Sequence, residues 1–176
     1  MIRKATASDI DAVSSVYEHI HTAEEAGETT TGWIRGVYPE RETALAALAR
    51  GDLFVQTDII RGKELVVGTA ILNRIQVDVY KTAPWKYDVP DSQVMVMHTL
   101  VIDPSFKGRG YGRKFEQFYE QYAAENSCRY LRIDTNAANN SARGFYKKLG
   151  YDEIDIVPCE FNGIPDVKLV LLEKRI

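Results

Sequence analysis

The stretch Val101-Ile-Asp-Pro-Ser-Phe-Lys-Gly-Arg-Gly-Tyr-Gly-Arg113 carries the strongest signal in this sequence. Its first two residues end the longest strand-like segment, residues 93–102, and Asp103-Pro104 stops that segment because proline cannot continue a strand ladder. Beyond the glycines, aromatic residues recur at helical spacing from Phe115 to Tyr122, which predicts a helix of about 15 residues. A glycine turn that leads into a helix exposes backbone N–H groups beside a positive dipole end. The stretch therefore predicts a phosphate or pyrophosphate site, with a plain glycine turn as the alternative.

Two common nucleotide-binding motifs do not fit this stretch. A P-loop ends in Gly-Lys-Ser/Thr, whereas this sequence reads Gly112-Arg113-Lys114. The dinucleotide fingerprint needs glycine or alanine where Arg113 stands, and it normally follows the first strand of its domain. A general nucleotide-binding domain is therefore only a weak alternative.

Outward from this stretch, the sequence predicts strands and helices with no linker or repeat between them. Helices are expected at residues 9–21, with Ser8 as N-cap, at 41–50 and at 139–149. Strands are expected at residues 2–5, 53–57, 64–74, 93–102, 130–134, 151–157 and 167–173, the last two paired across Asn162-Gly163. Residues 28–39 and 76–91 read as irregular segments.

Composition sets limits on the class of protein. The 176 residues carry 22 Lys plus Arg and 25 Asp plus Glu, a net charge of −3, and 45% are hydrophobic. These values predict one globular domain and argue against a dedicated nucleic-acid binder. Cys128 and Cys159 are too few for a disulfide framework or a zinc site, so free thiols are expected. Neither a signal peptide nor a membrane span is visible, so a cytoplasmic location is expected.

Two segments together resemble a known family. Lys107-Gly-Arg-Gly-Tyr-Gly112 is similar to the Q/R-x-x-G-x-G/A signature of the GNAT superfamily of acetyl-CoA-dependent N-acetyltransferases. The segment from Asn139 to Tyr151 resembles that family's N-x-x-A-x-x-x-Y-x-K-x-G-F/Y element. One departure is Lys107, where the family usually has Gln or Arg, because lysine keeps the charge but lacks the forked geometry of arginine. The resemblance implies a single α+β domain whose mixed, mostly antiparallel sheet is flanked by helices.

The resemblance also implies a binding site for acetyl-CoA. The pyrophosphate would lie on the loop residues Lys107, Gly108, Arg109, Gly110, Tyr111, Gly112 and Arg113, and the pantetheine arm along the main chain of Leu100, Val101 and Ile102. Asn139 would contact the cofactor arm, and it could equally be a simple N-cap. Tyr146 would contact the cofactor and protonate the leaving thiolate, since a phenol with a pKa near ~10 is neutral at pH 7. The structural alternative for Tyr146 is a half-buried core tyrosine.

The base that deprotonates the amine is less well defined by the sequence. His98 lies on the strand before the glycine stretch, and an imidazole suits proton transfer at neutral pH. The alternatives are a histidine satisfied within the sheet, or a Glu or Asp elsewhere that acts through water. His19 and His21 are expected on the solvated face of the first helix.

Aromatic residues in the two irregular segments are candidates for the acceptor wall. Trp33, Tyr38 and Trp85 would line a substrate pocket, or they would cap the core. The function implied is acetyl transfer from acetyl-CoA to a primary amine of a small molecule or peptide, with no nucleic-acid or membrane partner and with homodimerisation possible. The alternative is an inactive acyl-CoA-binding sensor or interaction module of the same fold.

Overall fold

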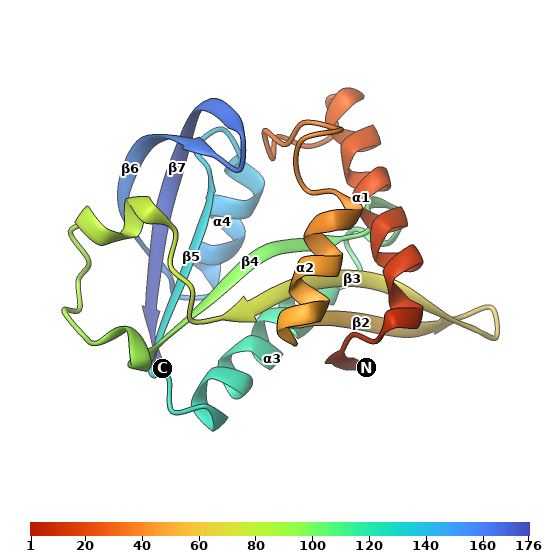
Figure 1. Cartoon of the computed structure of the whole chain (residues 1–176), viewed down its shortest axis with the longest axis horizontal. Coiled ribbons are helices and arrows are strands. Elements are labelled where there is room, and N and C mark those ends of the chain that lie inside the picture. Colours follow the sequence, from red (N-terminus) through yellow and green to blue (C-terminus); the bar gives the residue numbers. More distant parts are fainter.

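Seven strands form one mixed sheet in the computed structural model, which describes residues 1–176 (Figure 1). The spatial order is β1-β2-β3-β4-β5-β7-β6, and every neighbouring pair is antiparallel except β4 and β5. This confirms the mixed, mostly antiparallel sheet that the family resemblance implied. The strands are β1 (Ile2–Lys4), β2 (Leu53–Ile60), β3 (Lys63–Asn73), β4 (Val94–Ile102), β5 (Tyr130–Asn136), β6 (Asp152–Phe161) and β7 (Ile164–Arg175).

Helices cover both faces of the sheet. They are α1 (Ile10–Glu25), α2 (Arg41–Arg50), α3 (Tyr111–Glu125) and α4 (Asn140–Lys148), with short 3-10 turns η1 (Ala7–Asp9), η2 (Asp78–Thr82), η3 (Asp91–Gln93) and η4 (Pro104–Phe106). The pair α1 and α2 packs on one face of β2 to β4, and α3 packs on the other (Figure 1). The aromatic stripe of α3 explains its position, because Phe115 and Tyr119 are fully buried in the core on that face.

The first helix begins differently from the prediction. Ser8 is not its N-cap, because Ser8 lies inside the 3-10 turn η1; the N-cap of that turn is Thr6, and the N-cap position of α1 is Asp9. The carboxylate of Asp9 accepts a hydrogen bond from the backbone N–H of Thr6 at 2.7 Å and bonds of 2.7 and 2.9 Å from the guanidinium of Arg3. This capping-box arrangement satisfies a backbone donor at the start of the turn and ties the helix to β1.

Strands β4 and β5 separate after a short contact. They pair only over Val94–Val96 and Tyr130–Arg132, although β4 runs on to Ile102 and β5 to Asn136. A bulge contributes to the divergence, because the register of β4 against β3 shifts by one residue and Thr99 has a left-handed φ of 53°. The backbone edge of β4 beyond Val96 therefore has no strand partner on the side that faces β5.

The hairpin of β6 and β7 closes over this opening. Its turn is at Asn162-Gly163, as predicted, but both strands are longer than the sequence suggested. At its tip the ring of Phe161 meets the ring of Tyr38, with centroids 5.8 Å apart. The hairpin tip thus reaches the segment that follows α1, and the two flank the opening between β4 and β5 (Figure 1). None of the helices combines the length and apolarity required to cross a lipid bilayer.

Candidate functional site

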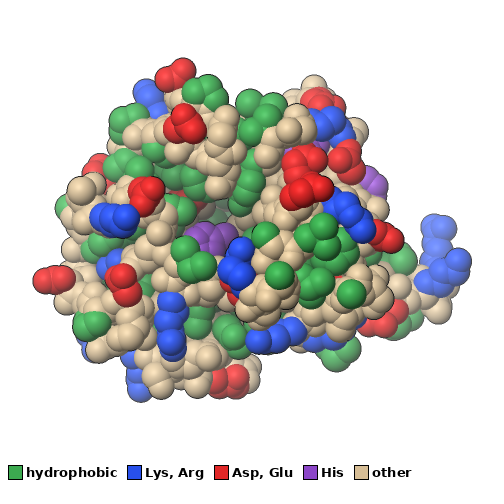
Figure 2. Space-filling model, viewed as in Figure 1, with side chains coloured by type: hydrophobic (Ala, Val, Ile, Leu, Met, Phe, Trp, Pro, Cys, Tyr) green, Lys and Arg blue, Asp and Glu red, His purple; other side chains and the backbone are tan.

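Two adjoining cavities occupy the opening between β4 and β5. The large cavity, of about 590 Å³, lies between the end of β4, the start of α3 and the start of α4. The small cavity, of about 90 Å³, lies between β4 and β5 beneath the β6–β7 tip. Both are lined by the same group of side chains, Thr31, Trp33, Leu100, Asn139, Ala142 and Tyr146. Figure 2 shows the hollow near the middle of one face, with hydrophobic side chains and an imidazole around it.

The glycine stretch forms one end of the large cavity. Gly108 and Gly110 both have a φ of +80°, a conformation that glycine adopts without steric cost. Helix α3 begins at Tyr111, and its first intrahelical bond runs from the N–H of Lys114 to the oxygen of Gly110 at 3.1 Å. The N–H groups of residues 111–113 therefore have no helical acceptor, and they lie with the positive dipole end along the cavity. These donors fit a pyrophosphate.

Two basic residues of this loop are placed differently from the prediction. The backbone N–H of Lys107 is already bonded to the oxygen of Pro104 at 3.1 Å, so this amide is not free for a phosphate, although the residue lines the large cavity. Arg109 does not line the large cavity, because its guanidinium lies over the ring of Phe106 at 5.4 Å. Arg113 does line it, and so supplies positive charge there.

The end of β4 and the start of α4 form the walls of the large cavity. Leu100, Val101 and Ile102 all line it, on the strand whose edge lacks a partner. Asn139 is the N-cap of α4, since its Oδ1 accepts a hydrogen bond from the N–H of Ala142 at 3.0 Å. This confirms the capping alternative and leaves the amide NH₂ as a donor at the junction of the cavities.

Tyr146 projects from α4 to the junction of the two cavities. It is only 5% exposed, and its ring packs against those of Phe145 and Tyr151. Burial raises the pKa of its phenol above the ordinary value, so the hydroxyl is neutral at physiological pH. A neutral phenol there can donate a proton to a group that lies where the two cavities meet.

His98 lines the small cavity, but its chemistry differs from that of an ordinary histidine. Its Nε2 lies 3.1 Å from Oδ1 of Asn73, an atom that can only accept, so this ring nitrogen carries the proton. Burial lowers the pKa of His98 to about 4, so the imidazole is neutral and weakly basic at pH 7. These features match a histidine satisfied within the sheet.

Asp134 is the one carboxylate that lines the small cavity, and the sequence analysis missed it. It lies on β5, and its Oδ2 accepts a hydrogen bond from the hydroxyl of Tyr80 at 2.8 Å. Burial raises the pKa of Asp134 to about 6, even though the bond from Tyr80 stabilises the charged form. The available signal was a single acidic residue directly after the buried stretch of this strand, but the predicted strand ended at this residue.

Aromatic rings from two segments, the one that follows α1 and the β6–β7 hairpin, line the small cavity. Trp33 and Tyr38 both line it, as predicted, and their rings meet edge to face with centroids 5.9 Å apart. The hydroxyl of Tyr38 is hydrogen-bonded to that of Thr99 at the bulge of β4. Phe161 completes this wall from the hairpin tip.

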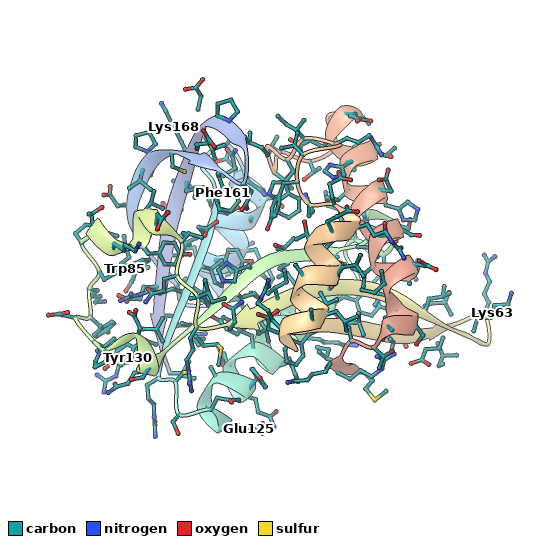
Figure 3. The ribbon with its side chains drawn as sticks, viewed as in Figure 1. Lys63, Trp85, Glu125, Tyr130, Phe161 and Lys168 are labelled. Carbon is teal, nitrogen blue, oxygen red and sulfur yellow. The ribbon has the colours of Figure 1, made fainter.

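Trp85 does not belong to this pocket. It lines neither cavity, and in Figure 3 it lies well apart from Phe161. Its ring stacks on the guanidinium of Arg132 at 4.0 Å, and its indole N–H donates to the oxygen of Tyr80 at 2.8 Å. Trp85 therefore corresponds to the capping alternative, because it holds the irregular segment against the sheet.

The two histidines of α1 also correct the sequence reading. His21 is not on a solvated face: it is 1% exposed, and its Nε2 lies 2.9 Å from the oxygen of Pro39. His19 is more exposed, and its Nδ1 lies 2.8 Å from the carboxylate of Asp103. Neither residue lines the described cavities, so neither takes part in the site.

Comparison with solved structures shows the fold. A GNAT-family acetyltransferase from Streptococcus agalactiae has a TM-score of 0.79 and 24% identity, with 100% of this chain and 95% of that chain covered. A Salmonella typhimurium protein solved with acetyl-CoA has a TM-score of 0.66 and 15% identity, with 99% and 92% covered. At these identities the likeness concerns the fold alone.

Sequence comparison shows the family. The N-alpha-acetyltransferase RimI of Mycobacterium tuberculosis is 28% identical over 91 residues, which are 52% of this chain and 48% of that protein. The chain spans less than half the length of three curated relatives that it matches, with 32%, 23% and, for RimI, 48% of their lengths covered. The model of the acetyltransferase (GNAT) family matches residues 14–151, most of the chain and both halves of the site. The chain therefore belongs to the acetyltransferase (GNAT) family.

Proposed function

We propose that this protein transfers an acetyl group from acetyl-CoA to a primary amine by direct attack of the amine. One observation carries the proposal: a large cavity with unpaired backbone donors meets a small cavity with one carboxylate, and Tyr146 lies at the junction. A donor and an acceptor bound in the two cavities would therefore meet beside a phenol and within reach of a carboxylate.

The residues of the large cavity fit the chemistry of acetyl-CoA. The free N–H groups of residues 111–113, with Arg113, would hold the pyrophosphate. The unpartnered edge of β4 at Leu100–Ile102 would bond the amide groups of the pantetheine arm as an added strand does. The amide of Asn139 would donate to the same arm. Bound acetyl-CoA supplies an acetyl group activated as a thioester.

Two residues would move protons in this reaction. Tyr146 would donate its phenolic proton to the sulfur as negative charge develops there, and burial keeps the phenol protonated until that moment. Asp134 would accept a proton from the attacking amine, with the hydroxyl of Tyr80 holding the carboxylate in place. We favour Asp134 over His98 because its pKa, about 6, is closer to the working pH than the value of about 4 for His98.

Ligand-dependent stability and thiol release together test this function. Acetyl-CoA at ~100 times Kd should stabilise the fold by about 2.7 kcal/mol and raise Tm by several degrees, whereas ATP and NAD should not. Free CoA should then appear when a primary amine is added, in an assay that detects the new thiol. If acetyl-CoA stabilises the fold but no amine causes thiol release, the protein is a sensor that binds acyl-CoA without turnover. If neither CoA nor acetyl-CoA stabilises the fold, the cofactor assignment is wrong.

A further inference from the structure

The small cavity has an uneven distribution of charge. No lysine or arginine lines it, and Asp134 is its only charged side chain, because the buried imidazole of His98 is neutral. On β7, Lys168 lies between two residues that line the cavity, Val167 and Leu169. Because successive side chains of a strand point to opposite faces of the sheet, the side chain of Lys168 points away from the cavity. Lys168 is exposed to solvent in the hairpin, where Figure 3 labels it. The cavity can therefore pair with one positive charge and with no negative one.

The size of the small cavity limits the acceptor further. Its volume is about 90 Å³, smaller than the ~150 Å³ apolar cavity that accommodates benzene. The rings of Tyr38 and Phe161 meet in the wall of this cavity, and Ile164, Val167 and Leu169 extend the apolar part of that wall. The body of an acceptor must therefore be compact, with an apolar part that packs against this wall.

We propose that the acceptor is a small monoamine with an apolar body smaller than a benzene ring, at most about five carbon atoms, without a carboxylate or a second charge. This substrate class rests on the proposed acetyl transfer. The amine nitrogen lies by Asp134, toward the junction with the large cavity, and the hydrocarbon body lies against the aromatic wall. An α-amino acid is disfavoured because its carboxylate finds no cation and is repelled by Asp134. A diamine is disfavoured because its second ammonium is buried among hydrocarbon.

Matched pairs of amines test charge separately from shape. Isoamylamine has the side chain and amine of leucine without the carboxylate, and pentylamine has the chain of cadaverine without the second amine. We expect kcat/KM for isoamylamine to exceed that for leucine by roughly 100-fold or more, since an unpaired charge in the cavity costs at least that factor. The same direction is expected for pentylamine over cadaverine. Equal or greater activity with leucine overturns the substrate class and leaves acetyl transfer standing.

A pair of variants tests the shape of the wall. Phe161→Ala removes a ring from the apolar wall, so we expect phenethylamine to improve roughly 10-fold relative to isoamylamine, since the removed ring leaves room for a larger body. Lys168→Ala, on the outer face of the neighbouring strand, is the matched control and should leave this ratio unchanged. If Phe161→Ala folds with the wild-type Tm and the ratio does not move, the position of the hydrocarbon body is wrong.

The failure of this inference can be told apart from the failure of the proposed function. If acetyl-CoA raises Tm but none of the four amines accelerates thiol release, both the substrate class and transfer to small amines are wrong. If acetyl-CoA gives no stabilisation, the cofactor assignment is wrong. If thiol release occurs with leucine at the rate of isoamylamine, or with cadaverine at the rate of pentylamine, only the substrate class is wrong.

Discussion

At the scale of single residues, the hydroxyl of Tyr146 is the group whose removal should slow the reaction most specifically. In Tyr146→Phe we expect kcat to fall about 100-fold, because a positioned general acid contributes ~10²–10⁴. The ring stays packed against Phe145 and Tyr151, so Tm should change by no more than a degree or two. Thiol-release kinetics and thermal melting measure the two effects.

Tyr151→Phe is the matched control for that variant. The hydroxyl of Tyr151 is buried without a hydrogen-bond partner, and the residue lines neither cavity. Its removal should leave kcat intact and should not lower Tm, because no bond is lost. A Tyr146→Phe enzyme with wild-type kcat would rule out the general-acid role.

The carboxyl of Asp134 predicts how activity depends on pH. A base accepts a proton only when deprotonated, so kcat/KM should fall as the pH drops below about 6, the raised pKa of Asp134. His98→Gln keeps a donor for Asn73, and this acidic limb should persist in that variant. A limb that disappears in His98→Gln and remains in Asp134→Asn would transfer the role of base to His98.

The same carboxyl predicts a change in stability with pH. Its folded pKa, about 6, lies above the usual value near 3.8, so its favourable contribution is complete below pH 4 and is lost as the pH rises through 6. Above pH 7 the buried charge should lower the free energy of unfolding by up to about 3 kcal/mol. Asp134→Asn should therefore gain stability relative to wild type between pH 4 and pH 7. Denaturant unfolding of both proteins at pH 4 and at pH 7 measures this difference. An Asp134→Asn variant that gains no stability over wild type between these pH values would contradict the raised pKa of Asp134.

At the scale of secondary-structure elements, the start of α3 depends on a left-handed glycine. A Cβ at Gly110 would meet no atom, so Gly110→Ala acts only through its φ of +80° and costs roughly 1 kcal/mol. A shift of this turn would move the N–H groups of residues 111–113, and we expect the Kd for acetyl-CoA to rise about 10-fold. Calorimetric titration with acetyl-CoA measures the change.

Gly51→Ala is the control that separates a loss of stability from a loss of affinity for acetyl-CoA. Gly51 ends α2 with a φ of +77°, and a Cβ there also meets no atom. Both variants should lose similar stability, but Gly51→Ala should bind acetyl-CoA normally. Equal affinity in the two variants would mean that the helix start does not hold the cofactor.

At the scale of the whole molecule, two parts of the chain join weakly across the site. Strands β4 and β5 pair over only three residues each, and the large cavity takes one wall from β4 and α3 and the other from α4. A ligand bound there would connect both parts. We expect acetyl-CoA to slow amide hydrogen exchange at residues 100–102 and 108–113, and to leave β6, at the far edge of the sheet, unchanged. Uniform protection along the chain would not fit a ligand in this cavity.

How much could be predicted differs between the fold and the site. Local periodicity predicted α2, the aromatic stripe of α3 and the turn at Asn162-Gly163, because each depends on residues close in sequence. The glycine stretch and Tyr146 were placed at the site from their motifs. The N-cap of the first helix was misassigned because Thr6 and Asp9 form an alternative with similar residues.

The sequence by itself determined the elements and the glycine stretch, since backbone conformation and hydrophobic period are local properties. Only the tertiary structure decided which polar residues face the cavities. It brought Asp134 beside Tyr80, 54 residues away in the chain, and raised its pKa by burial. It also turned Trp85 onto Arg132 and away from the pocket. Burial and long-range contacts fix such roles, because side-chain direction and desolvation depend on packing between distant segments.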